Sequence, residues 1–208
     1  MKNSLEMQEN KVSYGLTIFD IDDTLFKTDN KVYIIKNKRI RKKISSAEYA
    51  AYKLKEGETF DYREFRDSKL FFEQARPIKV VLKKLKAIAK RIKKRKYSEI
   101  IFVTARKNMN NKKLFLETFR EFGIDIDSIY IERAGNLNLP VHEAKKKIIT
   151  QYLKKKIFER VRLYDDQIKN LQSFFELKEK FPKIFFAAYL IKNKLIKRVS
   201  KSSILNMK

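Results

Sequence analysis

Two clusters of aspartates come directly after short apolar runs that have the length of β-strands. Asp20-Ile21-Asp22-Asp23 follows residues 14–19, and Asp165-Asp166 follows residues 161–164. Carboxylates this close together at the end of a buried strand are costly unless a cation or a proton is shared among them. If the two strands are neighbours in one sheet, Asp20, Asp22 and Asp165 converge at its edge. We therefore predict a cation site formed by these three aspartates.

The side chains available in the sequence restrict the kind of metal. The chain has no Cys and a single His, His142, which excludes a zinc site, whereas carboxylate oxygens suit Mg²⁺. A calcium loop of the EF-hand type is also excluded, because its pattern needs a glycine and a glutamate where this chain has Leu25 and Lys31. Mg²⁺ is therefore the cofactor that we expect.

Two further polar residues are candidates for the same edge of the sheet, one after a predicted strand and one on a predicted helix. Thr104 comes directly after the apolar run 99–103, where a threonine often only caps the following turn. Lys145 shares a predicted helix face with Ile148, Ile149 and Tyr152. A cation on a buried face normally has an anionic partner, and the aspartates are the obvious candidates. The alternative is a lysine whose ammonium group reaches solvent past the apolar face.

The elements that must position these residues alternate along the chain. Apolar runs predict strands at 14–19, 99–103, 128–131, 161–164 and 184–191, and amphipathic patterns predict helices at 78–96, 110–122, 142–156 and 167–180. Such alternation is typical of a mostly parallel sheet covered on both faces. We predict an α/β protein with a three-layer, Rossmann-like parallel sheet in the order 3-2-1-4-5.

One long stretch interrupts the alternation. Residues 31–43 have the pattern of a hairpin with Asn37-Lys38 at its turn, and Ser45-Ser46 begins a short helix that Gly57 ends. We predict a small cap inserted after the first strand, at 28–76, with the core formed by 13–27 and 77–191. The terminal segments 1–12 and 192–208 are expected to be flexible.

Charge dominates the composition. The chain has 37 Lys and 13 Arg against 25 Asp plus Glu, a net charge of +25. Two interpretations remain open: a genome that favours lysine codons, or a surface that attracts a polyanion such as nucleic acid or a phosphorylated substrate. A hydrophobic content of 43% excludes a disordered chain, and the absence of Cys excludes a disulfide scaffold. Without a membrane span or a signal peptide, we expect a cytoplasmic protein; its oligomeric state stays open.

Taken together, the motifs resemble those of the haloacid-dehalogenase-like superfamily. Asp20-Ile-Asp22-Asp23-Thr24-Leu25 is similar to the DxDxT motif of that family, and Thr104-Ala-Arg106, Lys145 and Asp165-Asp166 are similar to its other three motifs, in the family's order. Residues 52–62 and the run Glu132-Arg-Ala-Gly-Asn-Leu also look like small members encoded by bacteriophages, which would act in the host cytoplasm.

The resemblance implies a phosphatase that works through an aspartyl-phosphate. Asp20 would attack phosphorus, and Asp22 would protonate the leaving oxygen and then activate water. Thr104 and Lys145 would bind the phosphoryl oxygens.

The resemblance also implies a metal site. Mg²⁺ would be held by Asp20, the backbone carbonyl of Asp22, and Asp165. Asp166 would orient Lys145 or a metal-bound water, with Thr24 and Arg106 in support.

The substrate is less determined than the reaction. A short cap leaves the site open, which suits a nucleotide or a phosphorylated nucleic-acid end. The hairpin has seven basic residues and no acid, so it would serve as a rail for a phosphate backbone, with Tyr33 or Tyr52 stacking on bases; a merely solvated hairpin is equally compatible. The alternatives are a nucleic-acid-binding protein with a vestigial site and a phosphatase for a small metabolite.

Overall fold

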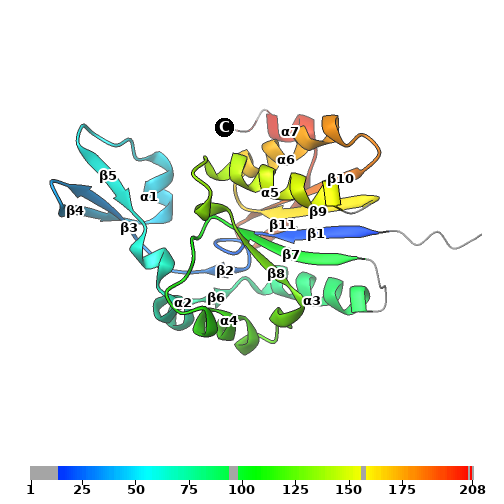
Figure 1. The fold of residues 1–208 in the computed structure, drawn as a ribbon, viewed down its shortest axis with the longest axis horizontal. Helices are drawn as coiled ribbons and strands as arrows, with labels where there is room; N and C mark the ends of the chain where they lie inside the picture. The colour runs from blue at the N-terminus through cyan, green and yellow to red at the C-terminus, as the bar shows by residue number, and fades with distance from the viewer. Residues whose placement is uncertain (1–13, 94–97, 156–157, 206, 208) are drawn as a thin grey trace, which may run out of the picture.

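A central, mostly parallel sheet organises the molecule (Figure 1). The computed structural model describes residues 14–93, 98–155, 158–205 and 207, and in this part of the chain the sheet has the order β11-β10-β9-β1-β7-β8. Its strands are β1 (Gly15–Phe19), β7 (Glu99–Thr104), β8 (Tyr130–Arg133), β9 (Arg160–Asp165), β10 (Phe185–Lys192) and β11 (Leu195–Val199). The predicted order 3-2-1-4-5 is confirmed, and β11 adds an antiparallel edge.

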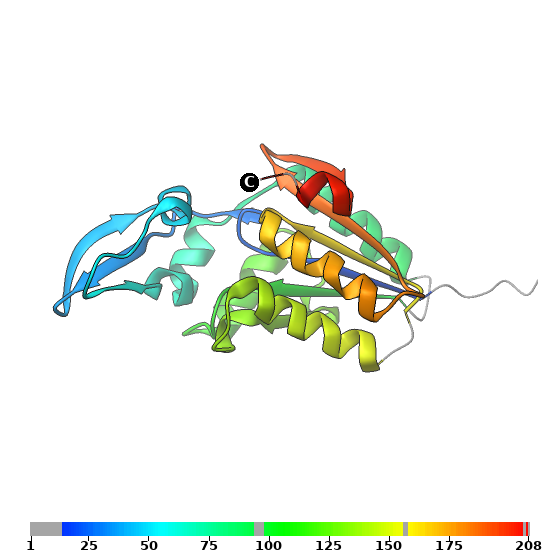
Figure 2. The ribbon, with the colours of Figure 1, turned by 90° about the horizontal axis from the view of Figure 1, so that it is seen from above.

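Helices cover both faces of this sheet, which makes the fold three-layered and Rossmann-like. One face packs on α3 (Lys79–Lys93), α4 (Lys112–Glu121) and α2 (Ser68–Gln74); the other packs on α5 (Val141–Lys155), α6 (Ile168–Lys180) and α7 (Lys201–Leu205). Figure 2 shows α5 and α6 on the opposite side of the sheet from α3. Short 3-10 turns η2 (Ile126–Ser128) and η3 (Ala134–Asn136) flank β8. None of the described helices is both long and apolar enough to cross a membrane.

The insertion after β1 forms a small sheet of its own. β3 (Val32–Lys36) pairs with both β4 (Arg39–Ile44) and β5 (Glu58–Asp61), and α1 (Ser46–Ala51) and η1 (Arg63–Arg66) complete this cap. A short ladder between β2 (Phe26–Lys27) and β6 (Arg76–Pro77) brings its two ends together. In Figure 1 the cap lies beyond the carboxyl ends of the parallel strands.

Local signals account for much of the cap. The short helix predicted to begin at Ser45-Ser46 is α1, which starts with a capping box of Ser45 and Glu48; it ends at Ala51 and not at Gly57. Gly57, with φ of +72°, instead makes the turn that leads into β5. The helix α2 falls within the predicted cap range 28–76, yet Phe71 packs in the core of the main sheet.

The chain beyond residue 192 differs from our expectation of a flexible tail, because residues 195–205 form β11 and α7. Its turn, Asn193-Lys194, repeats the turn Asn37-Lys38 of the cap hairpin, and all four residues have positive φ between 51° and 62°. Both turns lie in the same pattern, Ile-Lys-Asn-Lys-x-Ile, at 35–40 and 191–196. The predicted flexible segment 1–12 lies outside the described residues.

Replacing Lys194 by glycine should stabilise the protein. The left-handed conformation costs a residue with a Cβ about 1–2 kcal/mol, and the extra freedom of glycine in the unfolded chain offsets about 0.5–1 kcal/mol of the gain. We expect Lys194→Gly to raise the free energy of unfolding in urea by about 0.5–1 kcal/mol. Lys197→Gly, in the middle of β11, should lower it by a similar amount; equal effects of the two variants would contradict this account of the turn.

Candidate active site

Asp20 and Asp165 lie side by side at the carboxyl edge of the sheet. β1 and β9 are parallel neighbours in which Phe19 pairs with Tyr164, so that the next residue of each strand is one of the two aspartates. The backbone N–H of Asp20 donates to the carbonyl of Tyr164 at 3.0 Å and continues the ladder to this edge. The two carboxylates therefore converge because of strand order and register, as the sequence predicted.

Lys145 joins these two carboxylates. Its Nζ donates to Asp20 Oδ1 at 2.6 Å and to Asp165 Oδ2 at 2.8 Å. The helix α5 presents Lys145 on the face that also buries Ala144 and Ile148, and the lysine is only 3% exposed. Its ammonium group therefore does not reach solvent past the apolar face, and the predicted ion pair with the aspartates is confirmed.

Burial and mutual repulsion set the electrostatics of this cluster. Loss of hydration raises the pKa of Asp20 well above its usual value; Lys145 opposes this shift, and Asp165 adds to it. For Lys145, burial acts to lower the pKa, but the charges of Asp165 and Asp20 outweigh it and the pKa is raised. One ammonium group thus contacts two buried carboxylates, and the cluster has one positive charge for two groups that can be negative.

The two aspartates differ in how many of their oxygens are engaged. Asp165 Oδ1 accepts hydrogen bonds from the backbone of Gln167 and from Asn170 Nδ2, at 2.9 and 2.8 Å, in addition to the contact of Oδ2 with Lys145. Among the described residues, none donates to Asp20 Oδ2. The side chain of Asp20 is 6% exposed and that of Asp165 is fully buried. Asp20 is therefore the carboxylate that an incoming group can reach.

The carboxylate of Asp22 binds Arg106 and not Lys145. The guanidinium donates from Nε and Nη2 to the two oxygens of Asp22, at 2.9 and 2.7 Å. The fully buried Arg106 side chain also donates to the carbonyl of Phe65 and to Asn30 Oδ1, and it stacks on the Phe71 ring at 4.4 Å. Arg106, expected only in a supporting role, thus connects the loop after β1 to the cap.

Of the predicted metal ligands, the carboxylates of Asp20 and Asp165 lie together, and the third is the backbone carbonyl of Asp22, to which Arg106 donates no hydrogen bond. Within the part of the chain that the structure describes, no three acidic, His or Cys side chains are arranged to hold a metal ion. The carboxylate of Asp22 is engaged by Arg106, which leaves those of Asp20 and Asp165 together. Two carboxylates are nevertheless a donor set that suits Mg²⁺, which usually keeps several waters and takes substrate phosphate oxygens as further ligands.

The remaining predicted residues lie around the same edge. Thr104 is buried at the end of β7, and its Oγ1 accepts from the backbone N–H of Arg106 at 3.1 Å, so it caps the turn. Thr24 donates to Asp166 Oδ1 at 3.4 Å. Asp166 also accepts from Gln167 Nε2, and its hydrogen bonds therefore go to Thr24 and Gln167 rather than to Lys145.

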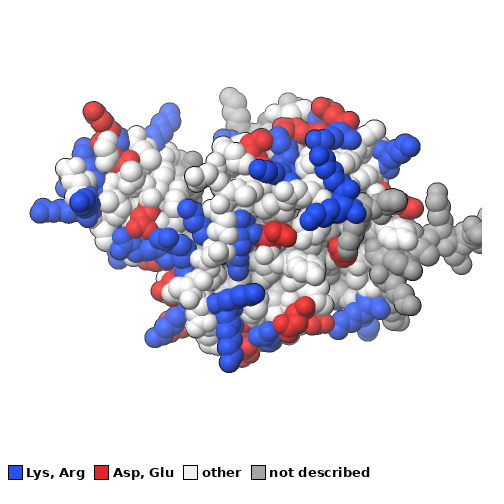
Figure 3. All heavy atoms as spheres, viewed as in Figure 1, with Lys and Arg blue, Asp and Glu red and all other residues white. Residues whose placement is uncertain are grey.

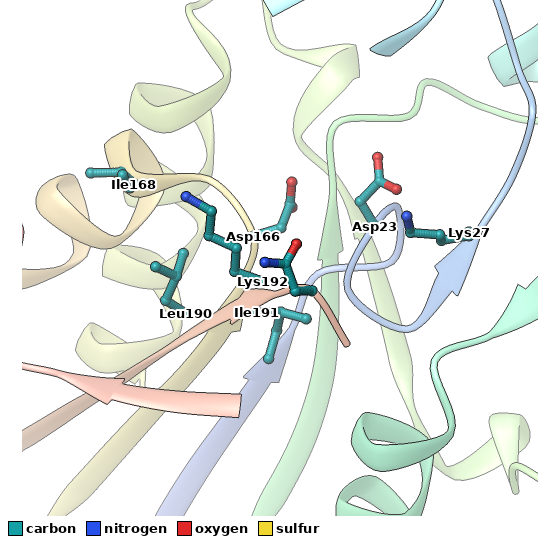
Figure 4. Close-up of a pocket in the computed structure, with 8 residues that line it drawn as sticks. Asp23, Lys27, Asp166, Ile168, Leu190, Ile191 and Lys192 are labelled. Carbon is teal, nitrogen blue, oxygen red and sulfur yellow. The ribbon is translucent and has the colours of Figure 1, made fainter. Parts of the chain in front are cut away.

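A pocket of about 270 Å³ opens beside Asp166. Figure 4 shows the carboxylates of Asp23 and Asp166 pointing in the same direction from neighbouring loops, with Lys27 and Lys192 nearby. Burial raises the pKa of both aspartates, and that of Asp166 rises to about 7 with a further contribution from Asp165. The pocket combines anionic and cationic side chains next to the buried cluster.

Our sequence interpretation missed several residues that shape this edge. Gln167, Asn170 and Asn30 hold the aspartates or Arg106, but amides carry no distinctive spacing. Arg133 ends β8, paired with Thr104, and stacks on the Phe115 ring at 4.4 Å. Burial, with a contribution from Arg106, lowers its pKa to about 10, and its buried Nη1 has no hydrogen-bond partner among the described residues. The position of Arg133 at the end of a predicted strand could have identified it as a candidate site residue.

Fold and site together define a Rossmann-like α/β protein with a buried aspartate–lysine–aspartate cluster at the carboxyl edge of its sheet and a small cap beyond that edge. The chain belongs to the family described as "Protein of unknown function (DUF2608)", whose model matches residues 2–160. This match includes Asp20, Asp22, Arg106 and Lys145 and ends at the start of β9. No curated protein matches the chain.

Two arginine–aspartate pairs of equal length allow the role of Arg106 in stability to be measured. In both Arg106–Asp22 and Arg76–Asp29 the Nη2–Oδ1 distance is 2.7 Å, but the Arg106 side chain is fully buried and that of Arg76 is 60% exposed. We expect Arg106→Gln to lower the free energy of unfolding by about 3–5 kcal/mol, because it leaves a partly buried carboxylate unpaired. Arg76→Gln removes a solvent-exposed pair and should change the free energy of unfolding much less. Similar losses in urea denaturation would contradict this assignment.

The raised pKa of Asp166 predicts a pH dependence of stability. The folded protein keeps this proton up to about pH 7, whereas the unfolded chain releases it near the usual value of 3.8. Because the folded state binds more protons in this window, the free energy of unfolding falls as the pH rises from about 4 to about 7. Asp166→Asn should make this fall shallower in thermal denaturation with EDTA.

The matched control for this prediction is Asp29→Asn. Its hydrogen bond with Arg76 lowers the pKa of Asp29, so above about pH 5 Asp29 is ionised in both states, and its replacement should leave the slope between about pH 5 and pH 7 unchanged. An unchanged slope for Asp166→Asn would contradict the prediction.

Proposed function

We propose that this protein is a Mg²⁺-dependent phosphomonoester hydrolase of the haloacid-dehalogenase type. The observation that carries the proposal is the pair Asp20 and Asp165, bridged by Lys145 at the carboxyl edge of a parallel sheet. In open α/β sheets this edge is where ligands bind. A carboxylate nucleophile with an adjacent cation suits attack on a phosphate, where the main obstacle is repulsion between anions.

Asp20 is the proposed nucleophile. Its Oδ2, which has no hydrogen bond from a described residue, attacks phosphorus; the bond to the leaving oxygen breaks and an aspartyl-phosphate forms. Water then attacks phosphorus in turn, which releases inorganic phosphate and restores the carboxylate. Asp165 is too enclosed for this role, because both of its oxygens accept hydrogen bonds and its side chain is fully buried.

Asp22 is the proposed proton carrier for both steps. It would donate a proton to the leaving oxygen and then take one from the attacking water. In the structure two hydrogen bonds from Arg106 hold its carboxylate, so donation requires at least one of them to be given up first. Because Arg106 also contacts Phe65 and Asn30, this step is linked to the position of the cap.

Positive charge at the site comes from the chain and from the expected cofactor. Lys145, already beside Asp20, would bind the transferring phosphoryl group, with the hydroxyl of Thr104 as a second donor. Asp20, Asp165 and the backbone carbonyl of Asp22 would hold Mg²⁺, with water and phosphate oxygens as further ligands. When bound, the ion supplies charge neutralisation of the phosphate so that a carboxylate can approach it.

We further propose a nucleotide or a phosphorylated nucleic-acid end as the substrate. The cap beyond the site exposes Arg39, Arg41, Lys42 and Lys43 on β4, and Figure 3 shows basic side chains on both the cap and the core. Tyr33 is not available for stacking, because it is 7% exposed and has Lys43 and Arg63 over its ring.

Other cap tyrosines have some ring surface open to a base. Tyr49 and Tyr62 on the cap are 37% and 38% exposed, and Tyr52 is partly buried against Phe60. These rings, rather than Tyr33, are the cap positions at which a base would stack.

Asp20→Asn is the test of this mechanism. We expect wild-type protein with Mg²⁺ to release inorganic phosphate from at least one member of a panel of nucleotides, sugar phosphates and 3′- or 5′-phosphorylated oligonucleotides. Asp20→Asn removes the nucleophile and should lower this rate by about 10⁴-fold or more.

Asp29→Asn, an exposed residue outside the site, serves as the control and should retain wild-type turnover. Absence of turnover by the wild-type protein on the whole panel would overturn the proposal. Preference for sugar phosphates would instead identify a metabolite phosphatase and overturn the nucleotide assignment alone.

A further inference from the structure

A second polar site lies on the sheet, away from the aspartates. On the α3 side, β9 presents Arg160 and Arg162, β10 presents Phe185, Ala187 and Tyr189, and β11 presents Arg198; with Glu159 these residues line a hollow of about 360 Å³. The crossover helices that follow β8 and β9 both pack on the opposite face. On the α3 side, the described residues leave a hollow over the amino-terminal part of β9 and β10.

The register of the strands explains the shape of the hollow. Ala187 forms its floor, because this residue has almost no side chain and pairs with Arg162 on the neighbouring strand. Phe185 and Tyr189 stand two residues to either side on the same face of β10. Arg198 pairs with Tyr189 from the other side, so that two arginines and two rings surround a small central residue.

The hollow contains two aromatic rings: that of Tyr189 packs on another ring, and that of Phe185 is exposed. Tyr189 stacks on Tyr164 at 4.4 Å with an angle of 6° between the rings, which holds it in place. Phe185 is 54% exposed, and the guanidinium of Arg198 lies 5.8 Å from its centroid. An exposed ring beside arginines offers a stacking surface next to positive charge, and this combination suits a ligand that is both flat and anionic.

The cations of the hollow are unusual for this chain. Lysines outnumber arginines by 37 to 13, yet all three cations here are arginines. Arg162 and Arg198 have no ion-pair partner among the described residues, while Arg160 has contacts elsewhere in the chain. Guanidinium groups bind phosphate with two parallel hydrogen bonds and also stack on planar groups, which ammonium groups do not do.

We propose that this hollow binds a nucleotide unit of single-stranded nucleic acid, with its phosphate at Arg162 and Arg198 and its base on Phe185. Charge complementarity and the exposed ring favour this ligand over an acidic peptide, which would use the arginines but not Phe185. The net charge of +25 adds long-range attraction for the same polymer. The proposal does not depend on the hydrolase function, since none of these residues belongs to the aspartate cluster.

Binding of a labelled oligonucleotide tests the proposal directly. Fluorescence anisotropy is measured with a fluorescein-labelled oligothymidylate about 12 nucleotides long, over a series of salt concentrations. The Asp20→Asn protein in EDTA is used throughout, so that neither turnover nor its absence affects the result. Arg162→Gln/Arg198→Gln should reduce the slope of log affinity against log salt by about 0.7, which corresponds to the loss of the one phosphate that the two arginines neutralise together.

A matched control separates the hollow from the general charge of the protein. Lys84→Gln/Arg91→Gln removes the same charge from the exposed face of α3 and should change the slope much less. Equal effects of the two double variants would overturn the proposal, because they would show that only net charge matters.

The ring provides a second test without any change of charge. Phe185→Ala should weaken binding about fivefold or more, and Phe185→Tyr should restore it, because stacking needs the ring and not its exact identity. Phe185→Leu keeps the apolar contact and serves if the alanine variant is unstable. Unchanged affinity in Phe185→Ala or Phe185→Leu, or displacement of the oligonucleotide by polyglutamate at equal charge concentration, would overturn the assignment to nucleic acid.

Discussion

The contact of one lysine with two aspartates determines the organisation of the carboxyl edge. Lys145 is buried between Asp20 and Asp165, and each member of this cluster would be expensive to bury alone. The arrangement requires β1 and β9 to be neighbours in register and α5 to place a long side chain across both. Since one cation faces two carboxylates, the cluster remains short of positive charge, and this shortage is what makes Mg²⁺ binding physically reasonable.

A second buried cation links the sheet to the cap. Arg106 spans Asp22, Asn30 and the carbonyl of Phe65, so the loop after β1, the start of the insertion and its last turn share one guanidinium. The cap has only a small apolar core of its own, around Val32, and polar contacts therefore carry much of its attachment. The loop that carries Asp22 and the cap are thus held by hydrogen bonds of the same guanidinium.

Local sequence patterns predicted most of the helices and strands. The prediction failed at a turn whose pattern was overlooked, and at contacts between residues that are far apart in the sequence. The turn at Asn37-Lys38 was predicted, while the identical Ile-Lys-Asn-Lys pattern before residue 195 was not, and the segment after it was expected to be flexible. The strand order and the convergence of Asp20 with Asp165 followed from alternation and from where ligands bind in such sheets. The pairing of the Asp22 carboxylate with Arg106 could not be predicted, because the sequence around an aspartate in a loop does not indicate which residue it will contact.

The sequence by itself determined the α/β alternation, the position of the aspartates at strand ends and the buried face of Lys145, because these depend on hydrophobic periodicity over a few residues. Only the tertiary structure decided which charges pair. Lys145 and Asp20 are 125 residues apart, and Arg106 and Asp22 are 84 apart, so their contacts depend on register and loop path. The same holds for the hollow around Ala187: three strands must align before its arginines and rings surround one small side chain.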